Sequence, residues 1–303
     1  MKTIKYLLTI FLLLLILDFL SNNLLSHFYK ENKIGQSGGK INNLLTHYDS
    51  VNILVVGNSR AAHHIDPSIL GKNNFNLSHN GMGLDFQVGI VNLILNSKIK
   101  IDTILFHIEE YEIVTNTPTT DITYLKYYYD QNEYIRYHIN KIDKYAFIKN
   151  ISKSYKFNGK ILSTIKNYIN TKQNSYYPIN GYIEKTENDT LLIEKQLKTK
   201  NKEPNRLIIN NKSKEYLLSL IELCKLNNIK LIIFQSPTLY KTKQSAVLKN
   251  FFLNNNTIYF DYYHNEIKDI NNIKNWIDPT HLNNKGAKII TNELRKDINE
   301  YPI

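Results

Sequence analysis

Short apolar segments rich in β-branched residues recur along this chain, separated by stretches with helical spacing. The first, residues 51–56, reads Val-Asn-Ile-Leu-Val-Val and stops at Gly57. Runs of this length and composition are typical of strands buried inside a sheet. The predicted strands are residues 51–56, 75–77, 102–106, 229–234 and 257–260, and the predicted helices are residues 86–95, 212–226 and 284–298. The alternation predicts an α/β fold in which helices cover both faces of a parallel sheet.

The alternation stops between about residues 114 and 205. Residues 121–169 are rich in Tyr and Lys, with helix-like apolar spacing and no clear strand, and residues 170–204 resemble a loop. We therefore expect an inserted, mostly helical cap at about 114–205 within an α/β domain of residues 49–303. The run Tyr127-Tyr-Tyr129 is interpreted as packing of the cap against the core, with stacking on sugars as the alternative.

The N-terminus carries an apolar run, residues 6–17, behind Lys2 and Lys5. A helix over residues 4–25 is long enough to cross a bilayer. No small-x-small pair follows, which favours an uncleaved signal anchor over the alternative, a removed signal peptide. The lysines predict a cytoplasmic N-terminus. We therefore expect a transmembrane anchor at residues 1–25, a polar juxtamembrane tether at 26–48 and a domain on the extracytoplasmic side.

The charge composition points to a class of partner. The formal net charge is +11 and the pI is about 9.3, but the lysines are scattered and form no long basic run. Without a nucleic-acid-binding motif, this balance argues against nucleic acid as a partner. An anionic envelope surface or an acidic glycan would be attracted by the same field. The single cysteine, Cys224, lies in an apolar pattern and is interpreted as a buried core thiol.

Ser59 follows the first predicted strand in the sequence Gly57-Asn-Ser-Arg60. A serine on the turn from a buried strand into a helix lies at the carboxyl edge of the sheet, where open α/β folds bind ligands. The helix N-terminus directs backbone N–H groups toward any oxyanion that forms there. A common turn with a serine near the start of a helix has the same pattern, so the motif alone leaves a structural role open.

A general base could come from Asp278-Pro-Thr-His281, just before the last predicted helix. A carboxylate three residues ahead of a histidine can hold the imidazole in the tautomer that accepts a serine proton. A second copy of the pattern, Asp261-Tyr-Tyr-His264, is interpreted as strand-end surface. The later copy is preferred for its proline, its trailing Gly286 and its position before the helix.

The strand followed by Gly-x-Ser, the glycine loop after the second strand and the C-terminal Asp-x-x-His together resemble the SGNH/GDSL hydrolase superfamily. The resemblance covers residues 49–113 and 206–303. It implies a three-layer α/β/α, flavodoxin-like parallel sheet. It also implies Ser59 as nucleophile, His281 as base and Asp278 as the residue that orients the base, with no cofactor and no metal.

The resemblance further implies donors for an oxyanion. These are the backbone N–H of Ser59 and a glycine of the loop over residues 76–83, with Gly81 the better candidate and Gly83 the next. For both glycines a tight turn that needs positive φ is the alternative.

Two departures from the family pattern bear on activity. Asn58 stands where the family has aspartate, and residues 106–110, Phe-His-Ile-Glu-Glu, lack the asparagine that donates to the oxyanion. Losing one such donor typically costs about 2.7–4 kcal/mol of transition-state stabilisation. His107 is the candidate substitute, with a structural histidine as the alternative. The pairs His63-His64 and Glu109-Glu110 match no zinc spacing, and the two histidines are expected on a helix surface.

Incomplete patterns of this kind occur among membrane-anchored SGNH proteins that act on cell-surface polysaccharides. The resemblance therefore implies O-acylation of an envelope glycan or polymer, or its reversal, with a membrane acyl-donor protein as a further candidate partner. The acceptor, water or sugar, stays open. A non-catalytic envelope protein that binds polysaccharide or an assembly partner is the alternative function. A third possibility is an unrelated exported α/β domain with accidental motifs.

Overall fold

The computed structural model describes residues 2–35, 38–114, 119–173, 180–186, 190–198, 208–240 and 246–300. The chain divides into two compact units. The first, here the helical unit, comprises Met1–Thr46 and Ile122–Tyr177, and the second, here the sheet unit, comprises His47–Asp121 and Pro178–Ile303.

The sheet unit is built on five parallel strands. They are β1 (Ser50–Val56), β2 (Asn74–Asn76), β3 (Lys100–His107), β4 (Lys230–Gln235) and β5 (Ile258–Asp261). Their order, β2-β1-β3-β4-β5, is the order of flavodoxin-like doubly wound folds. The prediction of an α/β fold with a parallel sheet is confirmed. Every predicted strand is present, with ends that differ by at most two residues.

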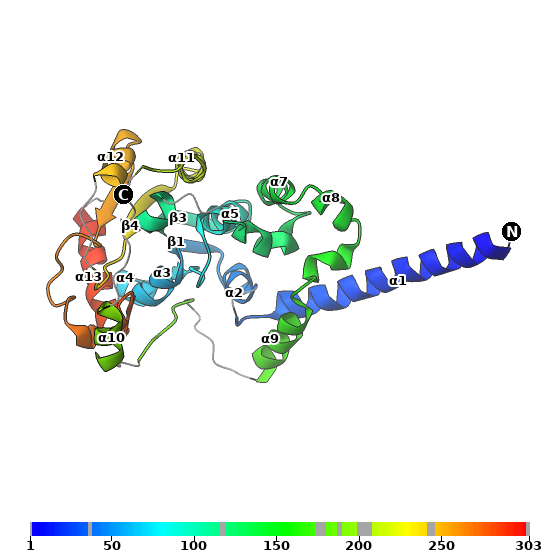
Figure 1. Cartoon of the computed structure of the whole chain (residues 1–303), viewed down its shortest axis with the longest axis horizontal. Coiled ribbons are helices and arrows are strands. Elements are labelled where there is room, and N and C mark those ends of the chain that lie inside the picture. Colours follow the sequence, from blue (N-terminus) through cyan, green and yellow to red (C-terminus); the bar gives the residue numbers. More distant parts are fainter. Residues whose placement is uncertain are drawn as a thin grey trace. The chain divides into compact units, whose positions relative to one another are not determined.

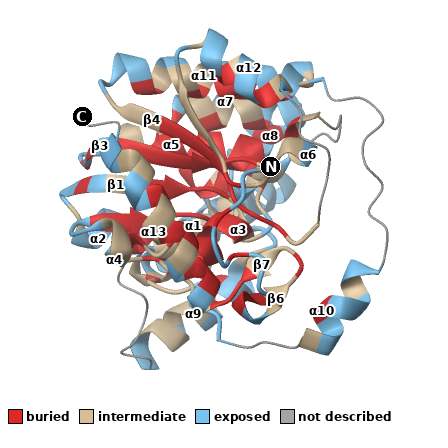
Figure 2. Cartoon of the chain, turned by 90° about the vertical axis from the view of Figure 1, so that its left-hand side faces the viewer, coloured by how far each residue is buried: buried red, intermediate tan, exposed pale blue. Residues whose placement is uncertain are grey.

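Helices lie on both faces of this sheet (Figures 1 and 2). On one side α5 (Leu84–Leu95) packs against α11 (Asn211–Leu226). On the other, α13 (Asn284–Glu300) packs against α3 (Ser59–His64) and α4 (Pro67–Leu70). Because both faces are covered, the central strands need apolar side chains on each, which explains their continuous apolar runs.

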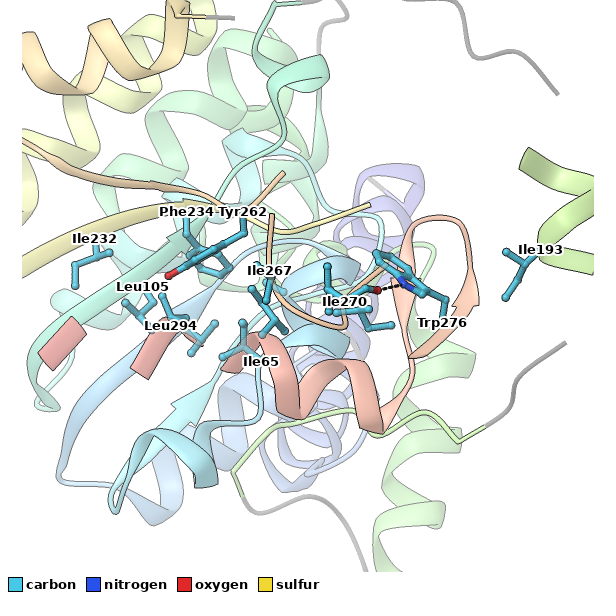
Figure 3. Packing of buried hydrophobic residues seen from close by; sticks show 14 residues of the cluster. Ile65, Leu105, Ile193, Ile232, Phe234, Tyr262, Ile267, Ile270, Trp276 and Leu294 are labelled. Carbon is cyan, nitrogen blue, oxygen red and sulfur yellow. Dashed lines mark hydrogen bonds between the residues drawn. The ribbon is translucent and has the colours of Figure 1, made fainter. Parts of the chain in front are cut away.

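The core between the sheet and α13 joins distant parts of the chain (Figure 3). Leu105 and Phe234 from the strands, Leu294 of α13 and Trp276 belong to one apolar cluster, and all four are fully buried. The Trp276 Nε1–H donates to the carbonyl of Ile270 at 2.7 Å, so the buried indole keeps a polar partner. Cys224 is buried, as its apolar surroundings predict.

The remaining elements of the sheet unit are short. They are α6 (Glu110–Val114), α10 (Thr190–Leu197), α12 (Val247–Asn254), a 3-10 turn η3 (Ile273–Asn275) and an antiparallel pair, β6 (Trp276–Asp278) and β7 (His281–Leu282). The segment 170–204 was predicted as loop, but α10 lies within it. Its Ile193 is fully buried in the core, and that contact was not visible in the local sequence.

The helical unit combines the N-terminus with part of the insertion. Its elements are α1 (Lys2–Glu31), α2 (Gly39–His47), η1 (Asp121–Tyr128), α7 (Glu133–Ile142), α8 (Ala146–Lys149), η2 (Lys153–Phe157) and α9 (Ile161–Gln173), of which α2 and η1 extend one residue past its borders. Both α9 and η2 pack against α1. Tyr29 of α1 stacks on Tyr127 with ring centroids 3.9 Å apart, and Phe157 meets Tyr29 edge-on.

These contacts change two predictions. The tyrosines at 127–129 are buried, but the rings that Tyr127 meets are those of Tyr29, Tyr128 and Phe157, all within the helical unit. Residues 26–48 were predicted as a polar tether, whereas α1 continues to Glu31 and α2 follows. Tyr29 extends α1 by burying its ring, and Ile41 and Leu44 bury one face of α2, so tertiary packing outweighs the polar composition.

Helix α1 is long and apolar enough to cross a membrane. The large apolar side chains from Ile4 to Leu20 are mostly exposed, which is the state expected of a helix whose partner is lipid. A signal sequence near an N-terminus has the same length and composition.

Candidate active site

The turn after β1 presents Ser59 at the carboxyl edge of the sheet. Asn58 is the N-cap of α3, and its Oδ1 accepts a hydrogen bond from the Arg60 N–H at 3.0 Å. Ser59 is therefore the first residue of the helix, a position whose backbone N–H has no partner within the helix. This N–H and the Ser59 hydroxyl both lie at the end of the strand.

Gly57 permits this turn because β3 passes very close. A Cβ added at Gly57 would lie 2.6 Å from the Cβ of Ala61 and 2.6 Å from the Cβ of His107. Both are stiff parts of the fold, one in α3 and one at the end of β3. The glycine of the motif is required by close packing.

Gly57→Ala is expected to lower the free energy of unfolding by about 1–3 kcal/mol, the usual cost of overpacking a core. It should also displace the turn that carries Ser59. Urea denaturation followed by circular dichroism measures the first effect. An unchanged unfolding midpoint would contradict the contact described at Gly57.

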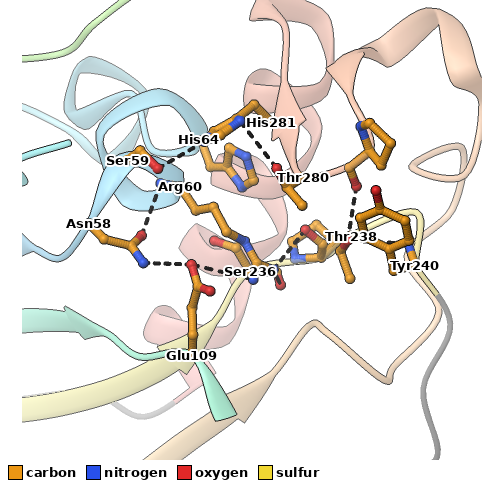
Figure 4. Close-up of polar contacts among 12 residues, drawn as sticks. Asn58, Ser59, Arg60, His64, Glu109, Ser236, Thr238, Tyr240, Thr280 and His281 are labelled. Atoms are coloured by element: carbon orange, nitrogen blue, oxygen red, sulfur yellow. Dashed lines mark hydrogen bonds and ion pairs between the residues drawn. The ribbon is translucent and has the colours of Figure 1, made fainter. Parts of the chain in front are cut away.

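His281 reaches Ser59 from the other end of the chain (Figure 4). The hairpin of β6 and β7 brings the His281 Nε2 to 2.8 Å from the Ser59 Oγ. The His281 Nδ1 lies 2.8 Å from the Asp278 Oδ2. Since an ionised carboxylate can only accept, Nδ1 carries the proton and Nε2 is free to accept from the serine hydroxyl. The three side chains form one continuous chain of hydrogen bonds.

The second oxygen of Asp278 is held by the turn itself. Its Oδ1 accepts from the backbone N–H groups of Thr280 at 2.8 Å and His281 at 2.9 Å, and from the Thr280 hydroxyl at 2.8 Å. Burial alone would raise the pKa of Asp278, but the hydrogen bonds from His281 and Thr280 outweigh it and hold the pKa below its usual range. The carboxylate is thus ionised and fixed in orientation at neutral pH.

The loop after β4 is hydrogen-bonded to the turn between β6 and β7. The Pro279 carbonyl accepts from the Thr238 hydroxyl and from the Leu239 N–H, both at 2.9 Å. Figure 4 shows the Thr238 contact beside the turn that carries Thr280 and His281. The position of the base therefore depends on the central strands as well as on its own turn.

Asn58, Arg60 and Glu109 form a cluster of polar contacts next to Ser59, here the polar hub. The sequence did not predict it. The Asn58 side-chain amide donates to Glu109 Oε1 at 2.5 Å, and the Arg60 Nη1 lies 3.7 Å from the same oxygen. Arg60 also donates to the carbonyls of Ser236 and Pro237 after β4. The hub ties together the carboxyl ends of β1, β3 and β4, so it fixes the residue that precedes the serine.

Two neighbouring histidines are buried, which corrects the prediction that they lie on a helix surface. His64 is fully buried, and its Nε2 accepts from the Leu282 N–H at 3.0 Å, directly after His281. The ring of His63 meets that of His281 edge-on at 5.7 Å. They face inward because α3 is covered by α13 and β7. Among the described residues, no three His, Cys, Asp or Glu side chains gather as metal ligands.

His107, the candidate substitute donor, is fully buried against Phe234, with ring centroids 5.2 Å apart. Neither of its ring nitrogens has a hydrogen-bond partner among the described residues. Burial, with the nearby charge of Arg60, lowers the pKa of His107 well below its usual value, and the same two causes act on His64. Both imidazoles are neutral in the folded protein.

These two histidines predict acid sensitivity. Below pH about 6.5 the unfolded chain binds protons at both positions while the folded protein does not, so stability falls as pH decreases from about 7 to 5. Each group contributes at most about 1.4 kcal/mol per pH unit. His107→Phe, which keeps a ring and removes the titrating group, should roughly halve the part of the slope that the pair contributes. Urea titrations at several pH values measure it, and equal slopes in both proteins would contradict the assignment.

The glycine loop runs beside the nucleophile turn. After β2 the Leu77 N–H donates to the Val55 carbonyl and the His79 N–H to the Gly57 carbonyl, at 2.8 and 2.9 Å. Gly81, two residues further, has a φ of +69°, and an added Cβ there would meet no heavy atom within 4 Å. The glycine is therefore required by its backbone conformation and leaves open space beside it.

Gly83 differs from Gly81 in that its N–H is already used. It donates to the Asp121 Oδ2 at 2.8 Å, and the next N–H, of Leu84, donates to the Glu112 carboxyl. Burial, together with the nearby Glu109, raises the pKa of Glu112 to about 8. Of the two predicted loop donors, Gly83 has its N–H bonded to Asp121, whereas Gly81 borders open space.

The second Asp-x-x-His has the same local geometry but does not contact the serine. The His264 Nδ1 lies 2.8 Å from the Asp261 Oδ2, at the end of β5. The His264 side chain is only 6% exposed, so its interpretation as surface was wrong. Its Nε2 has no hydrogen-bond partner among the described residues. Only the later copy meets Ser59.

Comparison with known proteins adds little to this geometry. No protein family and no curated protein matches the sequence. One solved structure, from Bacteroides fragilis and described there as a "putative acylhydrolase", aligns over 84% of this chain and 89% of its own at 13% identity and a TM-score of 0.38. A score of this size does not establish a common fold.

Proposed function

We propose that this protein is a membrane-anchored serine enzyme of the SGNH type that cleaves or transfers acyl esters of a cell-envelope glycan or polymer. The observation that carries the proposal is the hydrogen-bond chain from Ser59 through His281 to Asp278. Such a chain is the recognised arrangement for activating a serine hydroxyl, whatever the fold that bears it.

In the first step the Ser59 Oγ attacks the ester carbonyl while the His281 Nε2 takes its proton. Asp278 stabilises the imidazolium that forms. The tetrahedral intermediate collapses as the imidazolium returns the proton to the leaving alcohol, and an acyl-Ser59 ester remains. In the second step water or a sugar hydroxyl loses its proton to His281 and attacks that ester. The bond between the acyl carbon and the Ser59 Oγ then breaks, the imidazolium returns the proton to Oγ, and the acyl group leaves as a free acid or as an ester of the sugar.

The oxyanion would be held by the N–H groups of Ser59 and Gly81. Asparagine is missing from the end of β3, and Glu109 there accepts from Asn58 and pairs with Arg60. A two-donor site should be slower than a three-donor one by about 10²–10³. A modest rate is tolerable for an enzyme fixed beside its polymer, because anchoring raises the effective concentration of substrate.

Anchoring and export are part of the same proposal. The apolar part of α1 follows Lys2 and Lys5, which favours a cytoplasmic N-terminus and an external sheet unit. The net charge of +11 would draw the protein to anionic glycans or lipids. A membrane protein that delivers the acyl group is the partner needed if sugar is the acceptor.

Labelling with a fluorophosphonate tests the chemistry directly. Full-length protein in detergent should acquire one adduct, located on Ser59 by mass spectrometry of its peptides. His281→Ala should abolish labelling while Ser59 is still present, whereas His264→Ala, in the matching dyad, should not. Absence of an adduct in protein whose circular dichroism is that of a folded α/β protein would overturn the enzymatic proposal.

A non-catalytic role is the second candidate, and two observations favour it. The Gly83 N–H is engaged by Asp121, and a carboxylate occupies the end of β3 where a donor is expected. An envelope protein of this kind would use its basic surface to bind polysaccharide or an assembly partner. Full rescue of a deletion strain by Ser59→Ala, together with retention on immobilised polymer, would select this role.

A further inference from the structure

Helix α1 contains one acidic residue inside its apolar part, and that residue binds the insertion. Asp18 lies about 20 Å along the helix from Lys5 at 1.5 Å per residue. Its Oδ1 accepts from the Ser152 hydroxyl at 2.6 Å and from the Ser154 N–H at 3.1 Å, and its Oδ2 accepts from the Lys153 N–H at 2.8 Å. A carboxylate among lipid chains is costly unless it is paired, and these donors satisfy it.

The segment that reaches Asp18 carries exposed apolar side chains. Phe147, Ile148 and Ile151 are 71%, 62% and 68% exposed, although they precede the Asp18 contact by only a few residues. Within the helical unit these residues belong to α8 and the turn that follows it, and this turn leads into η2, which packs against α1 (Figure 1). Three large apolar side chains open to water so close together would be unfavourable in an aqueous setting.

Lysines flank these apolar residues in the sequence. Residues 141–160 contain six lysines and one acidic residue, Asp143. Lys149 pairs with Asp143 at 2.6 Å and Lys153 with Asp130 at 2.8 Å, both at exposed positions, and the Lys144 Nζ lies 5.0 Å from the centroid of the Tyr145 ring. Apolar and aromatic side chains interleaved with lysine are typical of segments that lie in the boundary between lipid headgroups and acyl chains.

The position of Asp18 determines the depth of this segment. If α1 enters the hydrocarbon near Lys5, a core about 30 Å thick extends beyond Asp18 by several residues. The hydrogen bonds to residues 152–154 then hold Ile151 and its neighbours at the level of the outer leaflet. An aqueous partner could not reach them there, whereas lipid necessarily does.

We propose that residues 145–153, here the boundary segment, insert into the outer leaflet of the membrane that α1 crosses, with their apolar side chains among the acyl chains and their lysines at anionic headgroups. The proposal rests on the membrane-anchoring part of the proposed function, but not on its chemistry. The protein would then hold the membrane at two places, of which one lies more than a hundred residues from the anchor in sequence.

Quenching of tryptophan fluorescence by brominated lipids tests the depth. Full-length Phe147→Trp is reconstituted into vesicles of phosphatidylcholine with phosphatidylglycerol, brominated near the carbonyl end of the acyl chains. Trp276 is fully buried in the sheet unit and provides the unquenched background in every variant. Leu253→Trp, at an equally exposed site on α12 (68%), is the matched control, and Leu14→Trp reports the anchor.

Phe147→Trp is expected to be quenched roughly twofold more strongly than Leu253→Trp, because boundary segments lie about 5–10 Å deep. If Leu14→Trp is quenched and Phe147→Trp is not, the insertion of the boundary segment is overturned and the membrane anchor stands. No quenching of either overturns both. Equal quenching of Phe147→Trp in vesicles without phosphatidylglycerol overturns the headgroup contacts of the lysines. A failure of phosphonate labelling changes none of these outcomes.

Discussion

Ser59→Ala is expected to reduce ester hydrolysis roughly 10³- to 10⁴-fold while the protein stays folded. Losing a triad serine costs about 10⁶ in a complete serine hydrolase, and the site described here begins with one oxyanion donor fewer, worth about 10²–10³. Within the part of the chain that the structure describes, the hydroxyl makes one hydrogen bond, to His281, and the helix cap is supplied by Asn58. The free energy of unfolding should therefore change by less than about 1 kcal/mol.

The assay is hydrolysis of p-nitrophenyl acetate by full-length protein, with thermal unfolding measured on the same samples. Ser68→Ala is the matched control, because Ser68 also lies in the first turn of a helix, where it bonds the cap residue Asp66, and it has no hydrogen bond to a histidine among the described residues. Equal residual rates for the two variants would show that Ser59 is not the nucleophile.

Asp278→Asn is expected to reduce the rate roughly 10³-fold through the wrong tautomer of His281, as in other triads. The geometry explains which way the amide must point. Three donors from Thr280 and His281 surround Oδ1, so the amide oxygen stays there and the NH₂ group replaces Oδ2. That NH₂ donates to Nδ1, which moves the ring proton to Nε2. The imidazole can then no longer accept the Ser59 proton.

The fold offers an unusually close control for this substitution. Asp261 accepts the His264 N–H with one oxygen and contacts the His264 Nδ1 with the other. Asp261→Asn should therefore impose the same change of tautomer on a histidine that does not contact Ser59, and the rate should stay near that of the unchanged protein. Equal losses in the two variants would mean that the effect of Asp278→Asn is structural.

The sequence predicted structural elements well where the pattern lies in a few adjacent residues. The β-branched run before Gly57 indicates a buried strand because such residues need both faces covered, and β1 ends one residue before that glycine. The glycine itself was understood only in part. Gly57 is needed because the Cβ of His107, on the neighbouring strand β3, leaves no room for a side chain. The register between β1 and β3 sets that contact, and the register depends on the whole sheet.

The polar hub and the helical unit could not be predicted for the same reason. Arg60 reaches carbonyls at 236 and 237, and Glu109 meets Asn58, through contacts that no local pattern encodes. Likewise, nothing in the tyrosine-rich insertion indicates that Tyr127 would stack on Tyr29, almost a hundred residues earlier. Amphipathic spacing shows that a face is buried, but it does not identify the partner that buries it.

The hydrogen bond between Ser59 and His281 closes a loop of 222 residues. Bringing together two residues so far apart in the sequence costs chain entropy. We therefore expect this hydrogen bond to form late in folding, after the strands and helices between the two residues. During synthesis the nucleophile would leave the ribosome long before its base, and it would be an ordinary alcohol until then. Under the proposed function, the order of chain emergence would therefore keep Ser59 unreactive until the C-terminal part of the chain has been synthesised.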